Sequence, residues 1–210
     1  MKPITLVMQA FGPYKDAVTV DFTVLQNYSM FLITGPTGSG KTTVLDAMVY
    51  ALYGEPSGDV RKSDSVRSDF ADPGTETKVV FDFAIGDALY RVERQPKQDV
   101  PKKRGDGTKV QGAKAVVFEW KQDDWTVIAE SSGDIKEKIQ SIIGFRKEQF
   151  LQVVLLPQGE FRKLLISSTA DRESLLHTLF KTHIYRKLQD MVKADYNAAE
   201  EGVKEALQKQ

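Results

Sequence analysis

The chain has 210 residues, of which 41% are hydrophobic and 28% charged, and its 29 basic side chains equal its 29 acidic ones. This composition is typical of a soluble globular protein, and the length is ample for a hydrophobic core. The absence of cysteine excludes a disulfide framework, a thiolate zinc site and cysteine catalysis. Because no segment resembles a signal peptide or a bilayer-spanning helix, we expect a cytoplasmic protein with no membrane partner.

The first elements lead up to a glycine-rich loop. Residues 4–11 and 17–22 predict strands, because apolar and polar side chains alternate in the second of them. Residues 30–34, a short continuous apolar run, predict a central strand covered on both faces. After the loop, apolar residues at helical spacing predict a helix that ends at Gly54.

The middle of the chain alternates between hairpins and a charged segment. Residues 77–96 predict a hairpin with its turn at Gly86-Asp87, and residues 115–130 predict another. Residues 96–114 contain prolines and glycines and offer little to bury, so we expect a surface loop. Residues 132–145 predict a helix closed by a glycine.

The last third of the sequence is mostly helical. Residues 150–161 predict a strand stopped by a proline, and residues 167–180 predict a helix with capping residues at its start. Residues 184–210 form one polar helical pattern with a narrow apolar stripe, typical of the beginning of a coiled coil. The alternative is a terminal helix packed on the domain. The pattern ends without a cap, which indicates a truncated chain.

The glycine-rich loop fits the phosphate-loop pattern G-x-x-x-x-G-K-[ST] at every specified position. Its glycines allow successive N–H groups to face one anion, and the following helix presents its positive end there. Lys41 would reach the β- and γ-phosphates of ATP, and the Thr42 hydroxyl would bind Mg²⁺. The predicted nucleotide-binding residues are Gly35, Pro36, Thr37, Gly38, Ser39, Gly40, Lys41, Thr42 and Thr43.

A second candidate site residue is Gln158, which follows an apolar run and a proline. A glutamine amide can bind Mg²⁺ or hold an attacking water without changing its charge, and so can sense a γ-phosphate. The alternative is an exposed loop glutamine.

Several motifs occur together in a characteristic order: "FGPY" and "VDF", the phosphate loop "ITGPTGSGKTT", "VRSDFA", and "LLPQGEF". This order resembles the N-terminal half of the SbcC-type nuclease ATPases, relatives of the SMC and ABC ATPases. The resemblance implies an α/β fold, in which residues 1–182 form an ABC-type P-loop ATPase lobe with a mixed sheet and antiparallel hairpins around the phosphate-loop helix. Residues 183–210 would begin a coiled-coil helix.

The resemblance also implies roles for individual residues. Gln158 would contact Mg²⁺ and the nucleophilic water and, with Lys41, form the catalytic residues of this lobe. Tyr14 and Lys15 would lie near the adenine or ribose, and Arg67 would line the same side.

Two motifs needed for hydrolysis are absent from the sequence: an apolar strand ending in Asp-Glu, and an "LSGG"-like signature. In the resembled family both lie in the C-terminal half of the subunit. The resemblance therefore implies half of a split nucleotide-binding domain. It would need the C-terminal half and a second head, in a homodimer, to hydrolyse ATP. We expect this chain alone to bind ATP with Mg²⁺ and to hydrolyse it poorly.

Positive charge is concentrated between Arg91 and Lys114, where eight basic residues face three acidic ones. Within this segment Lys102, Lys103 and Arg104 are candidates for contacts with the phosphates of double-stranded DNA, independent of base sequence. The alternative is a solvated charged surface. The resemblance further implies an SbcD-type nuclease partner that docks around Tyr185–Tyr196.

The expected function is that of an ATPase subunit in a nucleoid-associated exonuclease complex. ATP-driven engagement of two heads would control DNA access and nuclease activity in repair and recombination. Two alternatives stay open: an SMC-type head that organises DNA without cutting it, and an autonomous small P-loop nucleotide kinase.

Overall fold

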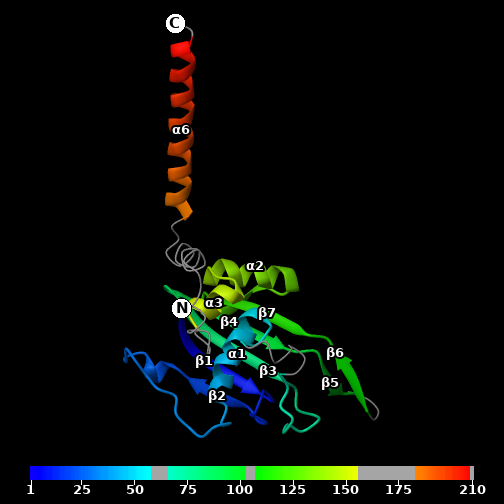
Figure 1. Cartoon of the computed structure of the whole chain (residues 1–210). Coiled ribbons are helices and arrows are strands. Elements are labelled where there is room, and N and C mark those ends of the chain that lie inside the picture. The colour runs from blue at the N-terminus through cyan, green and yellow to red at the C-terminus, as the bar shows by residue number, and fades with distance from the viewer. Residues whose placement is uncertain (58–65, 103–106, 156–182, 209–210) are drawn as a thin grey trace. The chain divides into compact units, whose positions relative to one another are not determined.

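The computed structural model describes residues 1–57, 66–102, 107–155 and 183–208 (Figure 1). The chain divides into two units, Met1–Leu151 and Gln152–Gln210. The first unit contains both sheets, and the second contains the long helix α6 (His183–Gln208).

The main sheet has six strands in the order β2-β1-β3-β4-β7-β8, and every neighbouring pair is antiparallel. The strands are β1 (Lys2–Gln9), β2 (Val18–Asp21), β3 (Lys78–Ile85), β4 (Ala88–Gln95), β7 (Lys114–Lys121) and β8 (Asp124–Ala129). A short 3₁₀ helix, η1 (Thr23–Leu25), follows β2. The strands predicted at 4–11 and 17–22 and both predicted hairpins are confirmed.

One face of this sheet forms the core. Leu6, Phe81, Val92, Val117 and Ala129 are register partners across five strands, and all are buried. Such a row of apolar side chains on one face is the pattern that buries a sheet against a covering element. The covering element is the predicted helix, α1 (Lys41–Tyr53), which contacts β1, β3 and β4 (Figure 1).

The end of α1 is fixed by a side chain from the sheet. The Arg94 guanidinium, on the core face of β4, donates to the carbonyls of Ala51 (2.9 Å) and Leu52 (3.3 Å). Burial lowers the pKa of Arg94, but the carbonyls at a helix C-terminus carry partial negative charge that favours a cation. Gly54 ends the helix in the left-handed conformation at φ 81°.

A matched pair of glycine substitutions separates backbone strain from crowding at this helix end. Gly144 ends α2 (Ser132–Ile143) with φ 82°, nearly the same as at Gly54, but an added Cβ would meet nothing within 4 Å. At Gly54 the Cβ would lie 2.8 Å from Arg94 Nη1. Urea unfolding is expected to show a loss of about 1–2 kcal/mol for Gly144→Ala and about 1–3 kcal/mol more for Gly54→Ala. Equal losses would contradict the role of Arg94.

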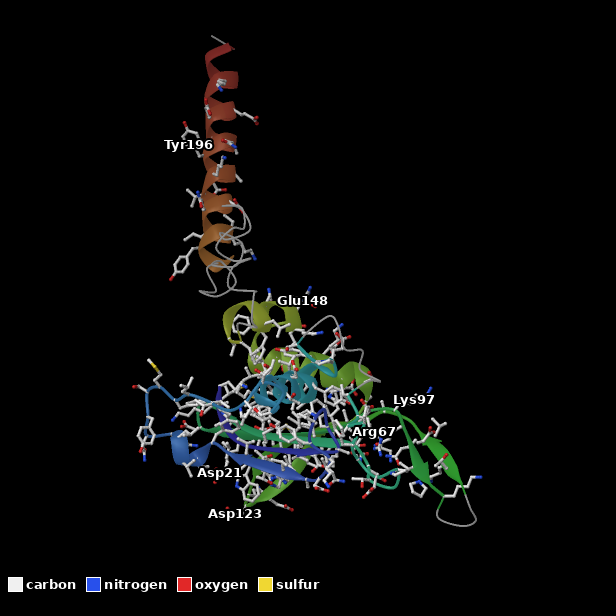
Figure 2. All side chains as sticks on the ribbon, turned by 60° about the horizontal axis from the view of Figure 1, so that its bottom comes forward. Asp21, Arg67, Lys97, Asp123, Glu148 and Tyr196 are labelled. Carbon is white, nitrogen blue, oxygen red and sulfur yellow. The ribbon has the colours of Figure 1, made fainter. Side chains whose placement is uncertain are left out.

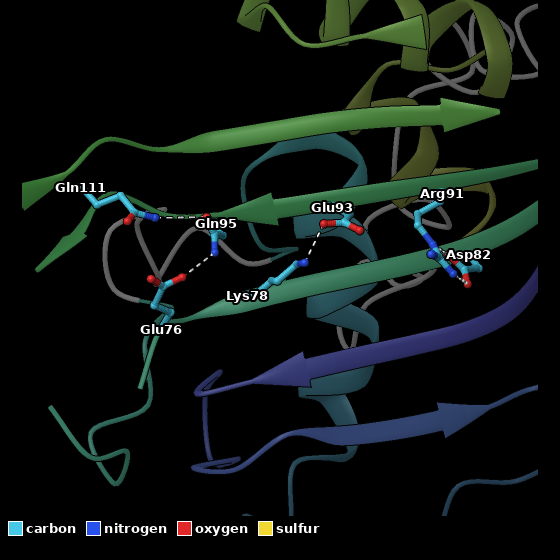
Figure 3. Close-up of polar contacts among 7 residues, drawn as sticks. All are labelled: Glu76, Lys78, Asp82, Arg91, Glu93, Gln95 and Gln111. Atoms are coloured by element: carbon cyan, nitrogen blue, oxygen red, sulfur yellow. Dashed lines mark hydrogen bonds and ion pairs between the residues drawn. The ribbon is translucent and has the colours of Figure 1, made fainter. Parts of the chain in front are cut away.

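The opposite face of the sheet is polar and carries ion pairs between strands (Figure 3). Asp82 accepts from Arg91 Nε and Nη2, both at 2.7 Å, and from the Thr5 hydroxyl at 2.8 Å. The hydrogen bond to Asp82 raises the pKa of Arg91, whose guanidinium also lies 4.5 Å from the ring centroid of Trp125. Lys78 and Glu93 pair at 2.6 Å on the same two strands. These bonds tie β1, β3, β4 and β8 together across a half-exposed surface.

The strand predicted at 30–34 is wrong for the described residues. The segment carries no strand, and Met30 and Leu32 are 86% and 84% exposed. An apolar run becomes a buried strand only when a neighbouring strand accepts its hydrogen bonds and an element covers it. In the described part of the chain, β1 already has β2 on one edge and β3 on the other.

The surface loop predicted at 96–114 is also wrong in part. It contains a two-stranded sheet of β5 (Gln98–Pro101) and β6 (Thr108–Gln111), and β7 begins at its last residue. Gln98 and Val100 are buried while Asp99 and Pro101 are exposed, so alternation along the strand overrode the loop-like composition.

Helices account for the rest. The strand predicted at 150–161 is wrong over its first residues, since α3 (Lys147–Val153) is helical and Phe150 is buried against Tyr53 with ring centroids 5.5 Å apart. The helices predicted at 132–145 and 184–210 are confirmed as α2 and α6. The helix predicted at 167–180 lies outside the described residues. Across the described ranges, no helix has both the length and the hydropathy needed to cross a bilayer.

Candidate phosphate-binding site

The glycine-rich loop turns back on itself before α1. Gly38 and Gly40 have φ values of 83° and 90°, a region that residues with a Cβ rarely adopt. The Ser39 amide donates to the Pro36 carbonyl at 3.3 Å, which closes a turn inside the loop. The loop therefore has the backbone geometry for which its glycines were predicted to be needed.

Lys41 spans this loop. Its ammonium group donates to the carbonyls of Gly35 at 2.9 Å and Pro36 at 2.7 Å, and the contact is exposed to solvent. These two bonds place the positive charge over the mouth of the loop. Phosphate oxygens are stronger acceptors than neutral carbonyls for an ammonium donor.

The start of α1 is left without the usual caps. No side chain accepts from its first amides, and no acidic residue lies in its first turn. By contrast, α2 is capped by Ser131, whose hydroxyl accepts from the Asp134 amide, and Asp134 adds a negative charge. Uncapped N–H groups at the positive end of a helix are what an anion binds. The residues present therefore fit a phosphate group.

The threonines after Lys41 differ in exposure. Thr42 is exposed, which suits the predicted contact between its hydroxyl and Mg²⁺, whereas Thr43 is only 6% exposed. Within the described residues, no cluster of three or more His, Cys, Asp or Glu side chains could hold a metal ion. A magnesium ion at this loop would use the Thr42 hydroxyl together with oxygens of the nucleotide.

The other predicted nucleotide contacts lie at different distances from the loop. Tyr14 is half-buried, and its hydroxyl donates to the Gly40 carbonyl at 3.2 Å. Lys15 is exposed and lies 3.9 Å from Asp16. The Arg67 guanidinium donates to Asp72, Thr75 and Thr77, so its described bonds serve the protein itself. The contacts of Tyr14, Lys15 and Arg67 with a nucleotide stay predictions.

Gln158 lies outside the described residues, as do Lys103 and Arg104. Lys102 is described and exposed, and its amide donates to the Gly107 carbonyl at 3.1 Å.

Sequence reasoning missed a buried polar pair below the loop. Gln98 accepts from the Thr77 amide at 2.6 Å and donates to the Thr77 carbonyl at 3.1 Å. Thr77 is fully buried, and its hydroxyl donates to the Ala10 carbonyl at 3.2 Å. No local pattern could have identified this pair, because the partners are far apart in the sequence.

Comparison with known proteins agrees with this site. The family described as AAA domain matches residues 5–210. The chain is 40% identical over 189 residues to a protein from Vibrio cholerae named as the SbcC subunit of nuclease SbcCD, covering 90% of this chain and 19% of that protein. The proteins of the same name from Lactococcus lactis and Staphylococcus saprophyticus are 42% and 34% identical over 92% and 97% of this chain.

The chain spans about a fifth of the length of these curated relatives. Its predicted α/β, P-loop ATPase fold class is confirmed, and so is the resemblance to SbcC-type ATPase subunits that its motifs predicted. The chain belongs to the AAA domain family.

Proposed function

We propose that this chain is the ATP-binding lobe of the ATPase subunit of a DNA-processing nuclease complex. One observation carries the proposal: a glycine loop spanned by Lys41 leads into a helix whose first amides have no cap of their own. ATP would place its phosphates against these amides, with Lys41 on the β- and γ-phosphates and Mg²⁺ on Thr42. Gln158 would report the γ-phosphate to the rest of the lobe.

The lobe would act as half of a split nucleotide-binding domain. The exposed apolar run at 30–33, which immediately precedes the phosphate loop, supports this proposal. In a complete domain a strand from the C-terminal half of the subunit would pair with this run and bring the catalytic carboxylate. A second head would supply the signature motif over the γ-phosphate. The domain boundary that follows from this proposal is residue 182.

ATP turnover tests the proposed function. The chain alone is expected to bind ATP with Mg²⁺ and to release phosphate no faster than a Lys41→Ala variant. Addition of the separately produced C-terminal half should raise the rate at least about tenfold, a change of about 1.4 kcal/mol in the barrier. Substantial turnover by the unaltered chain alone would contradict the split-domain proposal and favour an autonomous P-loop enzyme such as a nucleotide kinase.

The nuclease subunit would dock on α6. Tyr185, Leu188, Val192 and Tyr196 are exposed at spacings of three and four residues, which places them along one side of the helix. The same stripe fits a coiled coil with a returning helix, so the two partners would use successive parts of it.

DNA is the proposed partner of the β5–β6 hairpin. Lys97, Lys102, Lys109 and Lys114 are all exposed on or beside it, and Figure 2 shows Lys97 where the chain enters the hairpin. The buried side chains Gln98 and Val100 anchor the same hairpin to the domain. Exposed lysines on an anchored hairpin suit binding to phosphates without reading bases.

Charge reversal at the hairpin tip measures this DNA contact. The triple change Lys102→Glu, Lys103→Glu and Arg104→Glu is expected to weaken duplex binding. It should also lower the slope of log affinity against log salt by about 1 for each lost phosphate contact. A matched variant reverses Lys2, Lys121 and Lys136, which are exposed elsewhere, and should change both quantities less. Equal effects of the two triple variants would contradict a specific role of the hairpin.

In this account ATP would engage two heads, and its hydrolysis would open them and admit DNA to the nuclease. An SMC-type head that organises DNA without a nuclease would share the phosphate loop and α6. Co-purification of a nuclease subunit with the full-length protein distinguishes the two.

A further inference from the structure

We propose that Tyr14 is a positioning residue for the phosphate loop, which it orients through the carbonyl of Gly40. The inference rests on the proposed nucleotide binding at this loop. It differs from a contact between Tyr14 and the adenine or ribose, because here the tyrosine acts through the protein backbone.

The hydroxyl of Tyr14 donates to the Gly40 carbonyl at 3.2 Å, and the Val44 amide donates to the same oxygen at 3.2 Å. The Gly40–Lys41 peptide is planar, so its carbonyl and the Lys41 N–H point in opposite directions within one plane. Holding the carbonyl therefore also sets the direction of the Lys41 amide. That amide is the first of α1, at the end of the helix that would face the phosphates.

The tyrosine ring also forms the floor of the loop. A Cβ added to Gly40 would lie 2.6 Å from Tyr14 Oη and 2.9 Å from Pro13 Cγ. The loop backbone therefore rests directly on Pro13 and Tyr14. Glycine is required at position 40 by this contact as well as by its φ of 90°.

Tyr14 is itself held by a tight turn. The Phe11 amide donates to the Tyr14 carbonyl at 2.9 Å, and the Tyr14 amide returns the bond to Phe11 at 3.0 Å. Phe11 is 1% exposed, and its ring lies 5.5 Å from that of Tyr50 in α1. The Gly12 amide donates to the Val66 carbonyl at 2.9 Å, which ties the turn to a neighbouring segment.

Buried polar groups support the turn from below. The Ala10 carbonyl accepts from the Thr77 hydroxyl at 3.2 Å and from the Ser68 amide at 2.8 Å. Arg67 Nη1 donates to the Thr77 hydroxyl at 3.1 Å, and Gln98 closes two bonds with the Thr77 backbone. A side chain held on a scaffold of this kind can fix a backbone group that a phosphate-binding loop must present in one orientation.

The protonation state of the phenol suits this role. Partial burial raises the pKa of Tyr14 above its ordinary value, so the hydroxyl stays protonated and able to donate across the neutral pH range.

The test compares two tyrosines that make the same kind of bond. Tyr53 donates its hydroxyl to the Phe145 carbonyl at 3.1 Å, away from the phosphate loop. Loss of one such bond at the loop is expected to weaken ATP binding by Tyr14→Phe about three- to tenfold. Tyr53→Phe should leave the dissociation constant within about twofold of the unaltered chain, although both variants lose some stability.

Inorganic tripolyphosphate, measured by calorimetry beside ATP, identifies what Tyr14 acts on. If the residue positions the loop, Tyr14→Phe weakens tripolyphosphate and ATP by the same factor. A loss for ATP alone would overturn the inference in favour of a contact with the nucleoside, and unchanged affinity for both ligands would overturn it outright. If the unaltered chain bound neither ligand, the proposed function would fail and this inference with it.

Discussion

Lys41→Ala is expected to remove measurable ATP binding while the protein stays folded. The ammonium group bonds two loop carbonyls in an exposed position, so its removal leaves no buried group unpaired. In the complex with ATP the same group would face the β- and γ-phosphates. Truncating one partner of such a charged pair costs about 2–5 kcal/mol, which corresponds to tens to thousands of fold in the dissociation constant.

Equilibrium titration with a fluorescent ATP analogue measures this loss, and urea unfolding confirms that stability is retained. Lys136→Ala, which removes an exposed lysine from α2, is the matched control and should bind like the unaltered chain. Similar affinities for the Lys41→Ala and Lys136→Ala variants would contradict the assigned role of the loop.

Phe81→Ala is expected to cost the largest amount of stability of any single change considered. Phe81 is fully buried at the centre of the row that joins β1, β3, β4 and β7, and its ring lies 5.3 Å from that of Phe83. Removing a buried phenyl ring leaves a cavity and destabilises a domain by about 3–5 kcal/mol. The free energy of unfolding, measured by urea titration, should fall by this amount.

Phe70→Ala makes the same chemical change at a side chain that is 73% exposed. It should alter the free energy of unfolding by less than about 0.5 kcal/mol. If both variants lost the same stability, the sheet face described here would not be the core.

The phosphate loop was predictable because its chemistry is written in consecutive residues. The pattern from Gly35 to Thr42 needs no distant partner, and the strands and helix around it follow from alternation and helical spacing. The same holds for the two predicted hairpins, whose turn at Gly86-Asp87 and cross-strand pairs are close in sequence. Local signals of this kind were sufficient for most of the sheet.

The errors have a common physical cause. The run at 30–34 has the composition of a buried strand but, among the described residues, no strand beside it. The β5–β6 hairpin has the composition of a loop but is held by Gln98, whose partner is Thr77. The contact of Tyr14 with Gly40 joins residues 26 positions apart. In each case a long-range partner, or its absence, decided the outcome, and composition alone carries no information about such partners.

The central claim is that residues 35–43 hold the phosphates of a nucleotide, and amide NMR spectroscopy tests it most directly. Addition of ATP with Mg²⁺ to the ¹⁵N-labelled chain is expected to shift the amide signals of this segment most, and tripolyphosphate should reproduce the pattern. Shifts centred on another part of the chain, or a loop whose signals do not move at saturating ATP, would contradict the account.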